Sequence, residues 1–591
     1  MQAETTFLEN SKSVVKAFLS SVVLVDDRAY LSISDESVSP TTLVPPGRQG
    51  ATRLAEPVLL AKETGVSVAL PIIPPESSAK IASAETLAKQ VEPQPEKPPS
   101  KRDHTLNGKT VIDVFAQIGV VCAVLRPAKD ELAGLNDLVM SVGANADVVI
   151  LDWVLCDSQL GERTLELIKS IVASAAASGR ARLILIYTAE ADLIAIEKQI
   201  RKTLDLVEAV PTDTLTIISA GTRICVYGKA GTLADRIGDQ RIKTPAQLPE
   251  VVISEFTEMT KGLLSNVAMK SIASIREKTF QLLSRFDSTV DAPYVTQSAL
   301  ISPERAEEQV PSLIVSEIQE ILEDENVGSL ADYGHIVEWL DDRIANGLTL
   351  PDSTDLTSSA YYAGLVQLLK DGVRKEAVKK LRSEHAVFAE RIIPKNVKVN
   401  GKDKEPAKYV RESLTGILRS NPSIPHKADE TLAMLMSLRH RYSNPSPQLT
   451  LGAIISRTED AGPAYLLCLQ PLCDSVRLKE ARRFPFLCLE TATNTMNCEL
   501  IVSDGDDLKY LTLKASPYLL EMISFCPKKD EVIMAEKLND GFYFTSTSEV
   551  VYKWIANLKP AHAQRVANHF AHTFSRVGLI ESEWHRLGSK L

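Results

Sequence analysis

Short apolar runs that alternate with helical segments most restrict the fold of the first 235 residues. The runs have the length and composition of buried strands and lie at 21–25, 120–125, 148–151, 183–187 and 223–227. Residues 110–117, 131–142, 162–176 and 191–203 show helical spacing instead. Strands that alternate with helices in this way typically form a parallel sheet with helices on both faces. We therefore predict an α/β, doubly wound domain over residues 1–235.

The alternation is interrupted once and ends near residue 235. Residues 31–107 are rich in Pro and Ser, which predicts a flexible insertion directly after the first strand. Residues 250–440 have helical periodicity, which predicts a helical linker or interaction domain with helices at 252–283, 313–322, 333–345 and 361–393. Residues 447–591 predict an α+β domain of unknown role, with strands at 449–455, 465–469, 486–489, 498–502 and 510–513 and helices near 549–558 and 561–577.

Composition excludes several classes of protein. The 591 residues are 44% hydrophobic and 24% charged, as in globular proteins with large cores. A net charge of −10 gives no overall attraction to nucleic acid or anionic lipid. No apolar stretch approaches the 18 residues of a membrane span, and the first residues do not form a secretion signal. The eight cysteines are scattered and partly lie in apolar runs, which favours a reduced, cytoplasmic compartment.

Polar side chains stand where the predicted strands end. Asp26 and Asp27 follow the first strand, Asp152 the third, Thr188 the fourth, and Lys229 lies just beyond the fifth. The carboxyl ends of parallel strands meet at one edge of the sheet, where functional residues collect. Three carboxylates at one place repel one another, and a hard divalent cation, Mg²⁺, would relieve the repulsion. Such a carboxylate can attack a phosphoryl group, so we predict Asp152 as nucleophile, with Thr188 and Lys229 holding the phosphoryl oxygens.

The order of these residues resembles the receiver domain of two-component response regulators. The resemblance rests on residues 25–27 (Val-Asp-Asp), 151–155 (Leu-Asp-Trp-Val-Leu), 187–189 (Tyr-Thr-Ala) and Lys229. It implies a flavodoxin-like fold and Mg²⁺ bound by Asp26, Asp27, Asp152 and the backbone carbonyl of Val154. It also implies Asp152 as phosphoryl acceptor and Thr188 and Lys229 as the phosphate-sensing pair. The chain departs from the family at Cys156 and Ala230, where prolines are usual, and at Val226, where the family has an aromatic residue.

The resemblance implies a cytoplasmic signalling protein rather than a turnover enzyme. It would take a phosphoryl group onto Asp152 from a separate histidine kinase or kinase-like ATPase and relay that state to residues 250–591, which would bind other proteins. The run at 467–478 faintly resembles receiver-bearing components of bacterial stress-response or phage-defence operons. The input signal and the oligomeric state do not follow from the sequence.

Two alternatives remain open at this stage. The first is a pseudo-receiver that is never phosphorylated and acts as an adaptor between proteins. The second is an effector with a nuclease-like C-terminal domain, suggested by Asp507-Leu508-Lys509. We interpret His562, His569 and His572 as ordinary helix residues, because no Cys or acidic ligand stands near them. The basic excess at 391–411 contains a single aromatic residue and is typical of a solvated loop, so nucleic-acid binding is not predicted.

Overall fold

The computed structural model divides the chain into two compact units, residues 1–342 and 343–591, with the boundary inside one helix. The domain limits inferred from the sequence remain predictions. The described residues are 6–31, 105–127, 132–155, 161–179, 181–206, 215–219, 221–232, 240–301, 310–348, 357–394, 404–418, 427–460, 462–493, 498–514, 516–528, 531–538 and 540–574. The predicted insertion therefore lies almost wholly outside the described residues, as do Cys156 and residues 395–403 of the basic stretch.

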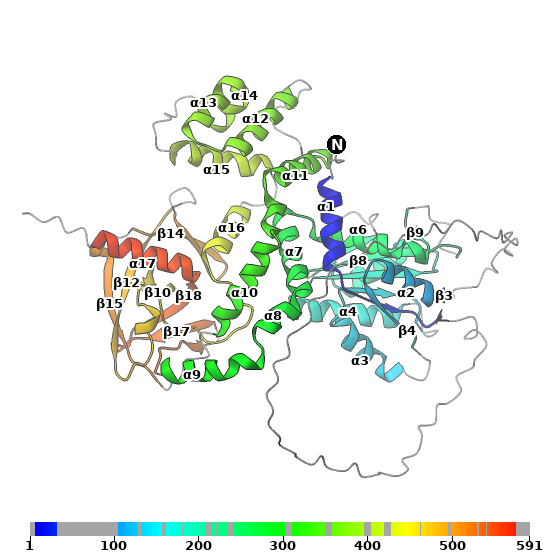
Figure 1. The fold of residues 1–591 in the computed structure, drawn as a ribbon, viewed down its shortest axis with the longest axis horizontal. Coiled ribbons are helices and arrows are strands. Elements are labelled where there is room, and N and C mark those ends of the chain that lie inside the picture. The colour runs from blue at the N-terminus through cyan, green and yellow to red at the C-terminus, as the bar shows by residue number, and fades with distance from the viewer. Residues whose placement is uncertain are drawn as a thin grey trace, which may run out of the picture. The chain divides into compact units, whose positions relative to one another are not determined.

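A parallel sheet forms the centre of the first unit (Figure 1). Its strands follow the order β4–β1–β5–β6–β8–β7, and β9 also pairs with β8. All neighbours run parallel except β7, which is antiparallel to β8. The strands are β1 (Ser21–Val25), β4 (Val121–Leu125), β5 (Val148–Leu151), β6 (Arg182–Thr188), β7 (Thr216–Ser219), β8 (Thr222–Lys229) and β9 (Ile242–Lys243). The doubly wound parallel sheet predicted from the sequence is thus confirmed.

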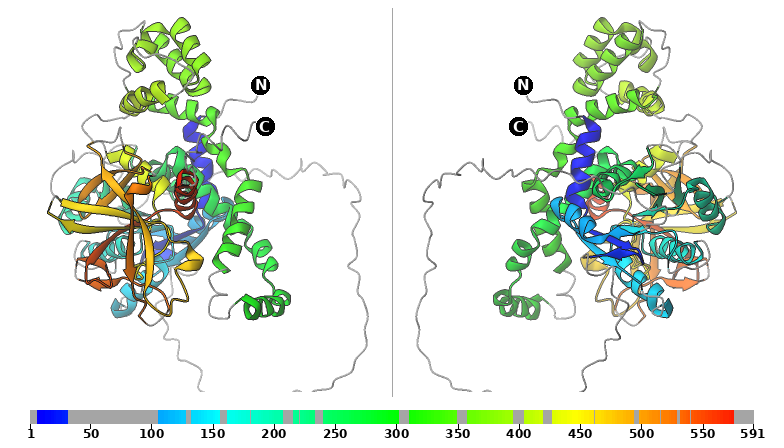
Figure 2. Two further views of the ribbon diagram at one scale, coloured as in Figure 1. Left: turned by 90° about the vertical axis from the view of Figure 1, so that its left-hand side faces the viewer. Right: turned by 90° about the vertical axis from the view of Figure 1, so that its right-hand side faces the viewer.

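Helices cover both faces of this sheet (Figure 2). Strand side chains alternate between the faces. Val22 and Leu24 join one core, while Val23 and Val25 join the other. The first core is completed by α1 (Phe7–Phe18), α2 (Gly108–Gln117), α6 (Leu248–Thr260) and α7 (Leu263–Glu277). The second is completed by α3 (Leu132–Gly143), α4 (Glu162–Ser178) and α5 (Leu193–Thr203).

The two ends of the predicted insertion lie side by side. β2 (Ala29–Tyr30) and β3 (Leu106–Asn107) pair as a two-stranded parallel sheet, with Ala29 opposite Leu106. Ala29 and Leu106 are both buried in the first core. The residues at the two ends of the predicted insertion are therefore neighbours within the folded domain.

Helices continue to the end of the first unit. The predicted helical stretch 252–283 is three helices rather than one, because the chain is extended at Gly262 and turns at Lys278. The later helices are α8 (Thr279–Arg285), α9 (Asp291–Ile301), α10 (Val310–Asp324) and α11 (Tyr333–Ala345). Short 3₁₀ turns lie at Pro245–Gln247, Ser288–Val290 and Val327–Ala331.

The second unit begins with short helices around a small apolar core. They are α12 (Thr357–Asp371), α13 (Lys375–Glu384), α14 (Ala386–Ile392) and α15 (Lys404–Leu418), and α16 (Lys427–Ser437) follows them and packs on the sheet of this unit. Tyr361 packs edge-on against Phe388, with ring centroids 4.9 Å apart. Gly364 is required beside this pair, because a Cβ there would lie 2.7 Å from the Phe388 ring. The helical middle region expected from the sequence is confirmed.

An antiparallel sheet follows in the second unit, in the order β13–β14–β12–β11–β10–β18–β17–β16, with β15 paired to β12. Both faces of the sheet are buried, one of them partly under α17 (Pro560–Phe574) through Ala563 (Figure 2). The strands are β10 (Ala453–Glu459), β11 (Gly462–Cys468), β12 (Arg482–Thr491), β13 (Leu500–Asp504), β14 (Asp507–Thr512), β15 (Leu520–Phe525), β16 (Glu536–Leu538), β17 (Gly541–Thr545) and β18 (Val551–Asn557). Short 3₁₀ turns lie at Leu472–Asp474 and Pro517–Leu519.

One prediction in this unit is wrong. Residues 549–558, predicted as a helix, form strand β18 between β10 and β17. The segment contains Val551, Tyr552, Trp554 and Ile555, and β-branched and aromatic side chains favour strands when neighbouring strands are present to pair. The predicted final helix at 561–577 corresponds to α17.

Candidate metal and phosphoryl site

Three carboxylates meet at the carboxyl edge of the parallel sheet. β1 and β5 are adjacent, Val25 lies opposite Leu151, and the amide of Asp152 donates to the carbonyl of Val25 over 2.9 Å. This register places Asp26 and Asp152 at the same level, one residue beyond each strand. Asp26, Asp27 and Asp152 each offer a carboxylate oxygen within 4.8 Å of the others. Asp26 and Asp152 are buried, and Asp27 is half-buried.

Lys229 completes the cluster from the end of β8. Its Nζ lies 2.7 Å from Oδ2 of Asp26 and 3.3 Å from Oδ2 of Asp152, and its side chain is 5% exposed. Burial alone would lower the pKa of Lys229, but the charges of Asp152 and Asp26 and their hydrogen bonds outweigh burial and raise it. The ammonium therefore remains charged and offsets part of the carboxylate repulsion.

The carboxyl group of Asp152 titrates near neutrality. Burial raises its pKa, to about 7, and the charge of Asp26 adds to the rise. The Lys229 charge and hydrogen bonds from Lys229 and the Trp153 amide act in the opposite direction without cancelling the rise. A bound cation would favour the ionised, nucleophilic form of this carboxyl group.

The loop after β5 fixes the orientation of Asp152. The amide of Trp153 donates to Oδ1 of Asp152 over 2.9 Å. The Thr164 hydroxyl, from α4, donates to the carbonyls of Asp152 and Trp153 at 2.9 and 3.0 Å. Trp153 is itself buried against Gly161, which begins α4. These contacts leave Oδ2 of Asp152 for Lys229 and an incoming group.

Thr188 and Val154 lie at the same edge without joining the cluster directly. Thr188 ends β6 and is buried, and its hydroxyl accepts a hydrogen bond from the amide of Glu190 over 3.2 Å. Among the described residues, no hydrogen bond joins Thr188 to the three carboxylates. The Val154 side chain packs on the second core. The roles predicted for the Thr188 hydroxyl and the Val154 carbonyl therefore stay predictions.

Tyr187 is a site residue to which the sequence analysis gave no role of its own. The Lys229 ammonium lies 5.8 Å from the centroid of its ring. Burial raises the pKa of Tyr187, and the charges of Asp26 and Asp152 raise it further. Its hydroxyl donates to the backbone carbonyl of Lys243 in β9 over 2.8 Å. Tyr187 thus connects the charged cluster to the edge of the sheet, a contact between residues 56 positions apart.

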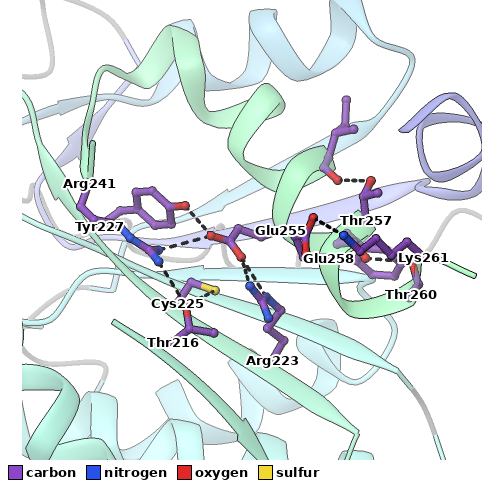
Figure 3. A network of polar contacts seen from close by, with 12 residues as sticks. Thr216, Arg223, Cys225, Tyr227, Arg241, Glu255, Thr257, Glu258, Thr260 and Lys261 are labelled. Carbon is purple, nitrogen blue, oxygen red and sulfur yellow. Dashed lines mark hydrogen bonds and ion pairs between the residues drawn. The ribbon is translucent and has the colours of Figure 1, made fainter. Parts of the chain in front are cut away.

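The strand that carries Lys229 is also bound to helix α6 (Figure 3). Glu255 of α6 accepts hydrogen bonds from Tyr227 at 2.5 Å and from Arg223 at 2.6 and 2.8 Å. Arg241 lies 3.3 Å from the same carboxylate and stacks on the Tyr227 ring. Tyr227 therefore faces α6, whereas Val226 faces the second core, as expected for neighbouring residues of a strand.

The donor set fits a divalent cation. Carboxylate oxygens are the ligands that Mg²⁺ prefers. When all three carboxylates are ionised, as a bound cation would favour, they and the ammonium carry a net charge of −2 (−3 + 1), which one divalent cation balances. Zinc fits less well, because the cluster offers neither the thiolate nor the imidazole ligands typical of zinc sites.

The nuclease-like residues of the second unit form ordinary surface contacts. Lys509 Nζ lies 3.1 Å from Oδ2 of Asp507, and the Asp507 side chain is exposed. Asp504 accepts hydrogen bonds from Lys553 at 2.7 Å and from Tyr465 at 3.0 Å. Among the described residues, the acidic groups of this hairpin do not come together as a metal cluster.

Comparison with known proteins agrees with the geometry of the first unit. Residues 18–234 match the family model of the response receiver domain. The match covers β1, β5, β6 and β8, which carry the site, and both acidic strand ends. Searches of curated proteins and of solved structures found no match to the chain. Along the described residues, no helix is long and apolar enough to cross a membrane.

Proposed function

We propose that the receiver domain of residues 18–234 accepts a phosphoryl group on Asp152 from a separate histidine kinase or kinase-like ATPase. The observation that carries the proposal is the convergence of Asp152 with Asp26, Asp27 and the Lys229 ammonium at one edge of the sheet. A buried carboxylate held by its neighbours beside a cation is suited to attack phosphorus. An ordinary surface aspartate lacks both the cation and the fixed orientation.

In the proposed step, an oxygen of Asp152 attacks the phosphorus of the donor. An O–P bond forms, the bond from phosphorus to the donor's imidazole nitrogen breaks, and that nitrogen takes up a proton. Lys229 neutralises charge on the phosphoryl oxygens, and the Thr188 hydroxyl donates to one of them after leaving the Glu190 amide. The Trp153 amide and Thr164 keep the Asp152 loop in place during the step.

The residues that would hold Mg²⁺ are Asp26, Asp27, Asp152 and the backbone carbonyl of Val154. The ion would supply charge neutralisation between the carboxylates and the phosphoryl oxygens. Before phosphorylation, Lys229 bridges Asp26 and Asp152. Its ammonium can follow the new charge on Asp152, because the phosphoryl oxygens are stronger acceptors than the oxygens of the carboxyl group to which the phosphoryl group is attached.

We further propose a cytoplasmic signalling role in which the phosphorylated state is relayed to residues 250–591, which bind other proteins. All the described cysteines are free, which agrees with a reduced compartment. The association with phage defence rests on the resemblance of residues 467–478 alone and stays a prediction.

Incubation of the full chain with acetyl phosphate and Mg²⁺, followed by intact mass measurement, tests the phosphoryl transfer. We expect a gain of one phosphoryl group that requires Mg²⁺ and disappears in Asp152→Asn. Asp147→Asn is the matched control, because Asp147 lies at the opposite end of β5 and accepts hydrogen bonds from Ser20 and Ser21. It should keep the mass gain.

A folded wild-type protein that gains no mass and shows no beryllofluoride-induced change in tryptophan fluorescence would overturn the proposal. That result would favour the alternative of an unphosphorylated adaptor. A nuclease assay of the full chain tests the remaining alternative, an effector with a nuclease-like C-terminal domain. Activity lost in the double variant Asp507→Ala, Lys509→Ala would support an effector.

A further inference from the structure

Large apolar side chains are concentrated on the surface of one part of the first unit. We define the apolar arm as helices α8 and α9 with the first turn of α10, residues 279–301 and 310–315 (Figure 1). Phe280 is 82% exposed, Leu300 77% and Val295 64%. The exposed large apolar residues of the arm are Phe280, Leu283, Phe286, Val290, Val295, Leu300, Leu313, Ile314 and Val315.

The arm begins where these helices leave the core of the unit. The second half of α10 packs against α7, and Ile318, Ile321 and Leu322 there are half-buried. Residues 311–316 at the start of α10 are exposed, and so are residues 291–300 of α9 except Tyr294 and Ser298, which are half-buried. A helix that exposes apolar residues in this way gains no stability from packing in a single copy, and patches of this kind mark contact surfaces.

The size of the arm matches what a stable dimer needs. Nine large apolar side chains exposed to this degree present on the order of 1,000 Å² of surface. A standard interface between two proteins buries about 800 Å² on each partner. A single peptide or small ligand would cover only part of the arm.

The charges of the arm favour a second copy of the same chain. The only charged residues of the arm are Arg285, Asp287 and Asp291, so two identical surfaces would meet with little like-charge repulsion. Asp287 is already engaged, since it accepts hydrogen bonds from the amide and hydroxyl of Thr289. A strongly charged partner would find few groups there to pair with.

The arrangement of α8 and α10 also suits a symmetric contact. Arg285 of α8 forms an ion pair of 3.2 Å with Glu317 of α10, which links the two ends of the arm. A two-fold axis brings one such surface against the same surface of a second copy, so that each copy covers the apolar side chains of the other.

We propose that two copies of this chain associate through the apolar arm, with the exposed apolar side chains of α8, α9 and the start of α10 in each copy packed against those of the other. This proposal does not depend on phosphoryl transfer. It places the contact beyond α7, outside the receiver's charged cluster, so that dimer formation and chemistry at Asp152 can be measured separately.

Sedimentation velocity of the full chain tests the proposal. We expect twice the mass of the 64.7 kDa chain at micromolar concentration. The double variant Phe280→Glu, Leu300→Glu should weaken the dimer at least about 100-fold, because it places two charges in an apolar contact. Both side chains are exposed in the single chain, so the fold should tolerate the change. Ile218→Glu, at a residue 69% exposed on the edge strand β7, is the matched control and should keep the dimer.

A wild-type chain that stays monomeric up to about 100 µM would overturn the proposal and indicate that another occupant covers the arm. A dimer that is equally stable in the arm variant and the wild type would also overturn it, because the contact would then lie elsewhere. Circular dichroism of each variant excludes unfolding as the cause of a lost dimer.

Discussion

Single residues around the proposed acceptor show how closely the site is packed. Asp152 is oriented by Trp153, and Trp153 is buried against the backbone at Gly161. Gly161 has φ +79°, a conformation that side chains rarely adopt, and a Cβ there would lie 2.2 Å from the Trp153 ring. Glycine is therefore required at this position for both backbone and steric reasons. Its effect on the site passes through Trp153.

Gly161→Ala should destabilise the loop and the start of α4. The expected cost is about 1–3 kcal/mol from overpacking against Trp153, in addition to about 1 kcal/mol from the backbone. Urea unfolding measures the loss in free energy of unfolding. Hydrogen exchange of peptides from β5 and α4 shows whether the loss is local to the loop and the start of the helix. Gly179→Ala is the control, because Gly179 ends the same helix at φ +65° with no atom within 4 Å of the new Cβ. Equal costs at the two positions would show that Trp153 does not limit the substitution.

At the scale of elements, β8 and α6 form a second polar cluster that holds the first unit together. Lys229 extends from the end of β8 into the charged site, while Arg223 and Tyr227 of the same strand bind Glu255 of α6. Burial alone would raise the pKa of Glu255. Hydrogen bonds from Tyr227 and Arg223 and the Arg223 charge outweigh burial, so the pKa lies below its usual value.

Glu255→Gln should therefore reduce stability in a pH-dependent way. A carboxyl group whose pKa is lower in the folded chain stabilises the fold above its unfolded pKa of about 4.3, and this stabilisation is lost as the pH falls through the folded value. We expect a loss of about 1–3 kcal/mol at pH 7 that shrinks as the pH falls below about 4. Denaturant unfolding at a series of pH values provides the measurement.

Glu258→Gln serves as the control for that experiment. Glu258 lies on the same helix and pairs with Lys261 at 3.1 Å, but its side chain is 44% exposed (Figure 3). A solvent-exposed pair of this kind contributes under about 1 kcal/mol. A loss of stability in Glu255→Gln that does not change with pH would mean that the carboxylate charge does not stabilise the α6 contact.

Strands and helices of the receiver could be predicted from sequence where the residues of one segment were sufficient to indicate its structure. Strands β1 and β5 begin and end where their apolar runs do, because a central strand buried on both faces must be apolar throughout. Strand β7 was missed because an edge strand of four residues depends on its partner β8 for its structure. The segment 549–558 was misread because β18, an inner strand, likewise depends on pairing with β10 and β17.

The residues of the candidate site also form two groups, those that follow predictable strands and those whose contacts depend on tertiary packing. Asp26, Asp27, Asp152 and Lys229 could be brought together because each follows a recognisable strand and parallel strands end at one edge. Tyr187 and Glu255 could not be found in this way. Their partners Lys243 and Tyr227 lie 56 and 28 residues away, and the contacts depend on how β9 and α6 pack.

At the scale of the whole molecule, each unit has its own buried cores and should unfold as its own cooperative transition. A ligand that binds only the folded receiver stabilises that unit by about 2.7 kcal/mol at 100 times its dissociation constant. We expect calorimetry of the full chain to show two transitions. Mg²⁺ with beryllofluoride should raise the temperature of one, while the other, whose residues are not part of the site, moves less. Asp152→Asn should abolish the shift. One transition that moves as a whole would mean that the two units unfold together, and the phosphoryl state would then act on the stability of the entire chain.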